Sequence, residues 1–340
     1  MMGFAFREKT YAGIEISEDS IRAAAVIGKA AGVSIQHLET VKIPTKTLTP
    51  AFKHLNVKDL EALSVCLKKA CPRTRSGKIH VALPDACVKV LIQKITDLPK
   101  EFRDIGRMLL WRIASTYGIP EQELRVSWEN WGKDSDNRHV FLVAVGMEPV
   151  LAQYEAVFEA GGMRPVFLAP AGLARFNFYA PSLPDTGVMA YLGLFDEVIT
   201  LFVFLNGLPL FYRITRKGML RKDGGSAIND VDLLIQYYNS EFPENEIEKF
   251  FIASYIKSEN LMEQVFENVR NIDFIILDET QLIHFLQGRQ KKTGTSPDFT
   301  FVDETSLIQW DCPPNGMPLE DNPLPFYTTA LGAAQKGIVR

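Results

Sequence analysis

Two stretches of the chain share one pattern of hydrophobic and polar positions. In the first, apolar runs at Tyr11–Ile16 and Ile21–Ile27 flank a short polar turn. The second, residues 188–213, repeats this pattern about 175 residues later, and Asn206-Gly207 supplies a tight turn into a third apolar run. Apolar runs of this length between small or polar residues are typical of β-strands. The sequence therefore predicts two β-hairpins far apart in the chain.

The segment between the hairpins mixes helical and strand patterns. Residues 33–41 and 78–83 read as strands, and a mixed helical pattern lies at 59–69. Residues 100–117 carry apolar side chains on one helical face, and Gly118-Ile119-Pro120 ends that helix. The other expected elements up to the second hairpin are strands at 88–95, 124–132, 140–147 and 164–168, and helices at 150–160 and 169–180.

After the second hairpin the pattern is more irregular. We expect helices at 227–240 and 259–269, and strands at 248–253 and 274–277. Residues 286–323 are loop-rich, with partner contact and disorder as the two interpretations. Residues 326–337 form a closing helix dense in small side chains.

Composition and charge exclude several classes of protein. The chain has 340 residues and a formal net charge of −4, without the basic and aromatic cluster that nucleic-acid binding needs. Its four cysteines form no CxxC pair, which argues against zinc and for free thiols. The N-terminus is charged too early for a signal peptide, and no apolar run has the length of a membrane span. We expect a soluble protein that reaches a membrane only through a partner.

Two hairpins at this separation suggest a duplicated α/β domain, as in the actin and sugar-kinase group. We expect ribonuclease-H-like (actin/ASKHA) domains with an inserted α/β subdomain and, as the family resemblance given below implies, a reduced helical subdomain in the second half. The expected units are 9–83 with 164–182, the inserted 84–163, 186–325, and a closing helix at 326–340 that packs back on the first half.

The order of these elements, together with several short motifs, resembles the PilM family of actin-like type IV pilus assembly proteins. That family is related to FtsA and to the cytoplasmic part of GspL, and the resemblance covers nearly the whole chain. The motifs that carry it are Gly13–Arg22, Ala82-Leu83-Pro84, Leu98-Pro99, Trp111, Gly118-Ile119-Pro120, Phe141–Val145, Ala160-Gly161-Gly162, Leu173-Ala174, Gly207, Arg213, Ile235–Tyr238 and Ala330-Leu331-Gly332.

The chain departs from the family at the positions that hold a nucleotide. The first turn reads Glu15-Ile16-Ser17 where the family has Asp, a hydrophobic residue and Gly. The second reads Tyr191-Leu192-Gly193 and lacks the acid. Ala253-Ser254-Tyr255 replaces a Gly-Gly beside the adenosine, and only residues 216–229 fill the place of a helical subdomain. Because phosphate loops need small residues that let backbone N–H groups approach, this predicts a degenerate site.

Two interpretations of the hairpin residues stay open. If a nucleotide site is retained, it is formed by Glu15, Ser17, Ser20, Arg22, Gly193 and Gly332, with ATP and Mg as cofactors. In the other interpretation, the hairpin residues form a polar tip without a ligand, and Gly332 allows close packing of the last helix. Asp196 and Glu197 are expected to face solvent, and Trp128 and Trp131 to pack in the subdomain or to line a partner groove. No histidine has a Ser or Cys partner at a motif spacing, so we predict no catalytic residue and no metal site.

The resemblance implies a cytoplasmic scaffold of a type IV pilus or type II secretion platform, peripheral to the inner membrane. Its partner would be the cytoplasmic tail of a PilN-like single-pass membrane protein, besides other platform proteins and further copies of itself. The tail would dock in a groove lined by Ile79, Val81, Val140, Leu142 and Val143. The alternatives are an ATP-binding protein or ATPase and, from the fold alone, a sugar-kinase-like enzyme without a visible base.

Overall fold

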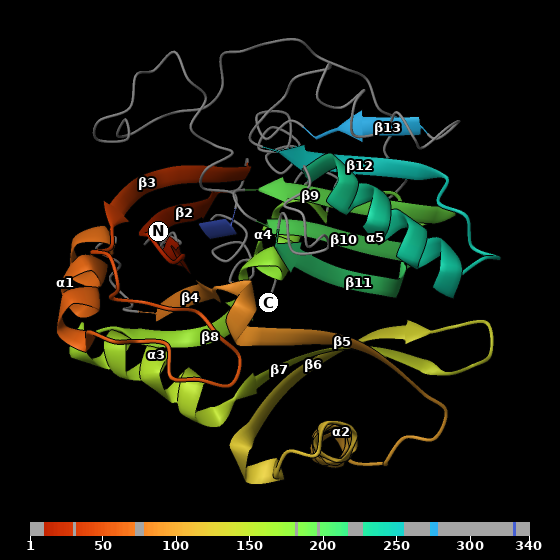
Figure 1. Ribbon diagram of the computed structural model, residues 1–340, viewed down its shortest axis with the longest axis horizontal. Helices are drawn as coiled ribbons and strands as arrows, with labels where there is room; N and C mark the ends of the chain where they lie inside the picture. Colours follow the sequence, from red (N-terminus) through yellow and green to blue (C-terminus); the bar gives the residue numbers. More distant parts are fainter. Residues whose placement is uncertain are drawn as a thin grey trace, which may run out of the picture.

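The computed structural model describes residues 10–29, 32–71, 78–180, 183–195, 198–216, 227–254, 273–277 and 329–330. The described strands form two five-stranded sheets and one three-stranded sheet (Figure 1). The five-stranded sheets lie side by side, and the three-stranded sheet runs below the second of them. Both predicted hairpins are confirmed, one in each five-stranded sheet.

The first sheet contains β1 (Thr10–Ile16), β2 (Ser20–Lys29), β3 (Gly32–Lys42), β4 (Lys78–Leu83) and β8 (Arg164–Pro170). Their order is β3-β2-β1-β4-β8, and β1, β4 and β8 run parallel. Helices α1 (Leu60–Ala70) and α3 (Glu148–Ala160) lie against it. The side chain of Asp59 caps α1 by accepting the N–H of Ala62 at 2.9 Å. The inner strands β1 and β4 are buried on both faces, which explains why they are almost wholly apolar.

The inserted unit is an antiparallel sheet in the order β5-β7-β6, with strands β5 (Val88–Ile95), β6 (Leu124–Lys133) and β7 (His139–Met147). Helix α2 (Phe102–Tyr117) packs on β6 and ends at Gly118, whose φ of 62° favours glycine. Arg125 on β6 donates to Glu148 at 2.7 Å and also to Glu155, both on α3. This ion-pair fork joins the inserted sheet to the helix that covers the first sheet.

The second five-stranded sheet has the order β11-β10-β9-β12-β13. Asn206 and Gly207 both have positive φ, 51° and 75°, as a tight hairpin turn requires. Helix α5 (Ala227–Glu241) covers one face, where Val231, Leu234 and Tyr238 join the core. The strands are β9 (Val188–Phe195), β10 (Val198–Leu205), β11 (Leu208–Arg216), β12 (Lys249–Ser254) and β13 (Asp273–Ile276).

Helix α4 (Ala171–Tyr179) joins the two halves through an aromatic core. The ring of Phe176 lies 4.8 Å from Phe202 and 5.4 Å from Tyr191, centroid to centroid. The same cluster takes in Val26 and Leu38 of the first sheet. The two halves therefore share buried apolar side chains instead of meeting only at a surface.

The inserted sheet also contacts the second half, along strands β5 and β11. Trp131 on β6 lies 5.8 Å from Phe204, centroid to centroid, and Trp128 packs edge-on against Phe141 at 5.5 Å. Both tryptophans therefore pack against other aromatic rings, as the packing interpretation expects. The sequence does not reveal that the inserted unit lies against the second half.

Some sequence-based expectations fall outside the described residues: the helix at 259–269, the loop region 286–323, Asp196, Glu197 and Tyr255. Of the closing helix, Thr329 and Ala330 are described, and both are helical and buried. The boundaries of the four expected units stay predictions. No described helix has both the length and the apolarity that a membrane crossing requires.

Candidate functional site

The candidate site lies at the β1–β2 hairpin and the side chains that face it from α4. At the tip, Ser17 donates its N–H to the carbonyl of Ser20 at 2.8 Å, and the N–H of Ser20 donates to Ser17 Oγ at 3.1 Å. The hydroxyls of both serines lie 2.9 Å from Asp19 Oδ1, and Lys42 donates to Asp19 Oδ2 at 3.1 Å. The N–H groups and hydroxyls of both serines are therefore engaged inside the turn.

The acid at the tip is ionised under all ordinary conditions. Partial burial opposes its charge, but hydrogen bonds from Ser20, Lys42 and Ser17 together lower the pKa of Asp19 to about 2. Lys42 pairs with this carboxylate, so the tip is a polar turn held by hydrogen bonds and one exposed ion pair.

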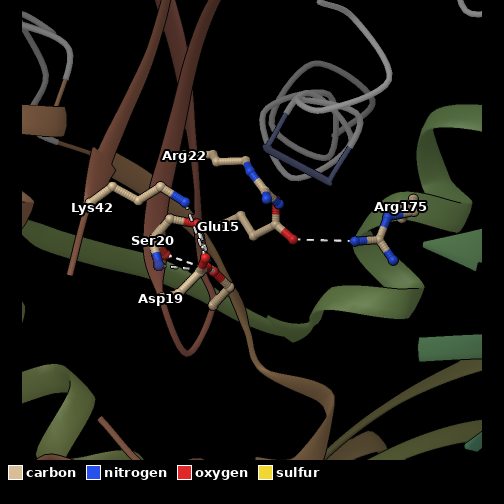
Figure 2. Close-up of polar contacts among 7 residues, drawn as sticks. Glu15, Asp19, Ser20, Arg22, Lys42 and Arg175 are labelled. Atoms are coloured by element: carbon tan, nitrogen blue, oxygen red, sulfur yellow. Dashed lines mark hydrogen bonds and ion pairs between the residues drawn. The ribbon is translucent and has the colours of Figure 1, made fainter. Parts of the chain in front are cut away.

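Glu15 occupies the position of the family's first acid, and it is held by two arginines. Arg22 faces it across the β1–β2 pair and donates at 3.3 Å, and Arg175 on α4 donates at 3.2 Å (Figure 2). The side chains of Glu15 and Arg175 are 4% and 5% exposed. The guanidinium of Arg175 also lies 4.2 Å from the ring centroid of Phe195, on the second half. Both arginines are therefore paired with a buried carboxylate.

A second acid, the partly buried Asp85, lies at the start of α4. It follows β4 and accepts the N–H of Gly172 at 2.8 Å. Burial raises the pKa of Asp85 to about 6, against the opposing effects of the Gly172 N–H and Arg175. A Cβ at Gly172 would lie 2.9 Å from the Tyr212 hydroxyl and 2.7 Å from Ile214 Cδ1, both on β11. The N-terminus of α4 is thus packed closely against the second half at Gly172.

Gly193 is part of a strand and not of a turn. It pairs with Thr200 on β10, and a Cβ there would lie 3.2 Å from the Tyr191 hydroxyl. Its lack of a side chain makes room for that tyrosine. Across the hairpin ends, Arg216 at the end of β11 lies 4.0 Å from Glu18 in the first turn, an exposed ion pair between the two halves.

The structure thus groups four of the predicted nucleotide residues, Glu15, Ser17, Ser20 and Arg22, in one internally bonded hairpin. Gly193 lies in the other five-stranded sheet, and Gly332 lies outside the described residues. The sequence analysis did not predict Arg175 and Asp85 as site residues. A signal existed for Arg175, because it is the lone charge in the apolar helix α4 and so implies a buried partner. Asp85 gives no such signal.

The five residues chosen for the partner groove are buried. They lie on β4 and β7, each an inner strand with hydrogen-bonded neighbours on both sides. Their exposures are 7% or less, so these side chains contribute to the core and the groove prediction stays without support from their placement. The residues concerned are Ile79, Val81, Val140, Leu142 and Val143.

No protein-family model matches the chain, and no curated protein matches it in sequence. Among solved structures, the PilM–PilN type IV pilus biogenesis complex matches 96% of this chain and 98% of its own, with a TM-score of 0.68 at 15% identity. The chain has the actin-like fold of PilM. The PilM-like arrangement thus confirms the fold expected from the order of the motifs.

Two further structures are similar at lower scores. A Bacteroides thetaiotaomicron protein with an actin-like ATPase fold has a TM-score of 0.49 at 11% identity and covers 84% of this chain and 99% of its own. Cyto-EpsL is the cytoplasmic domain of EpsL, an inner-membrane component of the type II secretion system of Vibrio cholerae. It has a TM-score of 0.48 at 10% identity and covers 84% of this chain and 97% of its own.

On the PilM-like fold, the β1–β2 hairpin and α4 present a sealed and electrically balanced cluster. Two carboxylates, Glu15 and Asp85, and two guanidiniums, Arg22 and Arg175, make up its charge. Among the described residues, the arrangement is suited to fixing the hairpin against α4.

Proposed function

We propose that this protein is a PilM-like structural component of the inner-membrane platform of a type IV pilus or type II secretion system, and that it works without a nucleotide cycle. On this proposal it lies in the cytoplasm and binds the cytoplasmic tail of a PilN-like membrane protein. Contacts with other platform proteins and with further copies of itself stay predictions. The observation that carries the proposal is the Glu15–Arg175 ion pair, set in a fold that matches PilM over 96% of the chain.

The proposal that the protein works without a nucleotide rests on the partners that the site residues already have. ATP binding on actin-like folds needs free N–H groups for the phosphates and a free acid for the metal. Here the N–H groups of Ser17 and Ser20 are used within the turn, and Glu15 is used by two arginines. Millimolar Mg-ATP is therefore expected to leave the thermal midpoint unchanged, because only a ligand of the folded state raises it. A concentration-dependent rise would restore the ATP-binding alternative.

The partner role rests on the fold and on one free strand edge. In the first sheet β4 is an inner strand, so a peptide cannot add to it, whereas β8 pairs only with β4 among the described strands. The β4–β8 register shifts between Ile79 and His80, and Val166 at this irregularity is 42% exposed. Extended peptides add to such edges through main-chain hydrogen bonds, with pockets for alternate side chains.

The test is a titration of the purified chain with the cytoplasmic tail peptide of the PilN-like protein encoded by the same organism. Val166→Arg places a long cation on the β8 edge and is expected to weaken binding about tenfold or more. Val65→Arg on α1 is the matched control, because Val65 has a similar exposure of 44%. Failure of the unaltered chain to bind the tail would refute the partner role. Equal binding by both variants would show that the tail peptide does not dock on β8.

A further inference from the structure

The most exposed large apolar side chain of the described residues is Trp111, which is 60% exposed on α2. Burying its ring would remove a large apolar surface from water, so a solvent-facing tryptophan indicates a contact surface more strongly than a solvent-facing leucine. Figure 1 shows α2 at the lower edge of the molecule, on the side of the inserted sheet away from β12 and β13. Nothing in the described structure covers this face of the helix.

The orientation of Trp111 is fixed by the opposite face of α2. Leu109 and Ile113 are buried in the core, and a Cβ at Gly106 would lie 3.1 Å from Trp128 Nε1. The helix cannot rotate to bury Trp111 without exposing these side chains. The outward position is therefore a stable feature of the fold.

The surroundings of Trp111 are basic, although the chain as a whole carries a net charge of −4. Arg107 lies one turn before it, Arg112 is exposed next to it, and Arg103 lies two turns before it. The side chains of Arg103 and Arg107 are 71% and 77% exposed, although Arg103 lies 2.7 Å from Glu101 and Arg107 lies 3.4 Å from Asp104. Asp104 is the only acidic residue of α2, so the helix itself has three cations against one anion. The remaining excess of positive charge is complementary to a negatively charged surface.

We propose that this face of α2, centred on Trp111 with Arg103, Arg107 and Arg112, contacts the anionic surface of a phospholipid bilayer. Tryptophan prefers the membrane–water interface, and arginine side chains interact with anionic headgroups while their stems lie along apolar surface. An outermost convex helix meets a flat bilayer directly, whereas a peptide ligand would need a groove. The inference rests on the proposed function only for the presence of a membrane nearby.

The contact would be weak by itself and effective together with a tethered partner. One tryptophan and three arginines correspond to the weak, reversible end of peripheral binding. A membrane-anchored partner tail keeps the chain close to the lipid and so raises the effective concentration of the surface for α2. The α2 face would then orient the platform component relative to the bilayer.

The test is flotation of the purified full-length chain with vesicles of phosphatidylglycerol and phosphatidylethanolamine, and separately with phosphatidylcholine vesicles. We expect binding to the anionic vesicles only, weakened by added salt. Trp111→Ala is expected to reduce the partition coefficient about tenfold, and the pair Arg107→Gln with Arg112→Gln about thirtyfold at low salt. Leu55→Ala, at an apolar site 52% exposed, and the pair Lys68→Gln with Lys69→Gln on α1 are the matched controls.

Absence of flotation by the unaltered chain, or equal loss in the control variants, would overturn the proposal. If Trp111→Ala instead weakened binding of the PilN-like tail peptide and left flotation unchanged, the face would belong to a protein and the proposal would again fail. The tail titration contains no lipid and the flotation contains no peptide. Failure of this inference is therefore distinguishable from failure of the proposed function.

Discussion

Replacing Glu15 by Gln tests whether the hairpin is held by its buried charges. The substitution keeps the shape of the side chain but removes the carboxylate that Arg22 and Arg175 share at 3.3 Å and 3.2 Å. Both guanidiniums would then lose the carboxylate that they share, and Asp85 would be the remaining acid of the cluster. Removing one member of a buried ion pair destabilises a protein by about 3–5 kcal/mol, because it leaves the other charge uncompensated.

The size of the thermal effect follows from the length of the chain. With about 2.1 cal/mol/K of unfolding entropy per residue and 340 residues, the total is about 0.7 kcal/mol/K. A loss of about 3–5 kcal/mol therefore lowers the midpoint by about 4–7 °C. Differential scanning calorimetry and urea unfolding of the same variant measure the loss independently.

Two further variants isolate the buried pair. Glu101→Gln breaks the Glu101–Arg103 pair, whose partners are 60% and 71% exposed, and is expected to change stability by less than about 1 kcal/mol. The double variant Glu15→Gln with Arg175→Gln should be less unstable than the sum of its single variants, because each removes the partner of the other. A midpoint for Glu15→Gln equal to that of Glu101→Gln, or strict additivity in the double variant, would refute the reasoning.

Three other predictions concern the contacts around this hairpin and the loop between β3 and α1. Burial raises the pKa of Asp85 to about 6 in the folded state, whereas an unfolded Asp titrates near 3.9. Between these two pKa values the folded state binds more protons than the unfolded state. The protein therefore loses stability as the pH rises from about 3.9 to about 6. Asp85→Asn should therefore stabilise the protein by up to about 3 kcal/mol at neutral pH. This stabilisation should disappear below the unfolded-state pKa of about 3.9. Equal urea midpoints for the variant and the unaltered chain at neutral pH would contradict the prediction. Gly172→Ala places a Cβ 2.7 Å from Ile214 Cδ1 and should cost about 1–3 kcal/mol by thermal unfolding. Asn56→Ala leaves the Ala51 N–H without the acceptor now 2.9 Å away and should cost about 1–3 kcal/mol, measured in the same way.

Local pattern was sufficient to predict most elements of the described chain. Strand β5 coincides with its expected range, and the expected end of α2 at Gly118 is the observed one. These two predictions were correct because the hydrophobic period, the turn residues and the residues that end helices act over a few neighbouring positions. The charge balance of the hairpin could not be predicted in this way, since Arg175 is 160 positions from Glu15 in the sequence. Likewise, nothing local places Trp131 against Phe204.

The same long-range contacts bear on how a PilM-like protein of this kind would work. Ligand-driven actin-like folds move one half relative to the other, and hinge motions of this kind need a cleft that can open. Here Arg175 lies against Phe195, Gly172 against Ile214 and Trp131 against Phe204, so that opening would expose buried rings and a buried cation.

On the proposed function, such a protein would transmit position and would not undergo a nucleotide-driven change of shape. The β8 edge and the outer face of α2 are joined through the inserted sheet, α3 and the Arg125 fork. On the proposed function, a tail held at β8 would therefore fix the direction in which Trp111 points. Loosening the fork with Arg125→Ala should weaken vesicle flotation in the presence of tethered tail more than tail binding itself. Equal effects on both would show that the two surfaces are not mechanically joined.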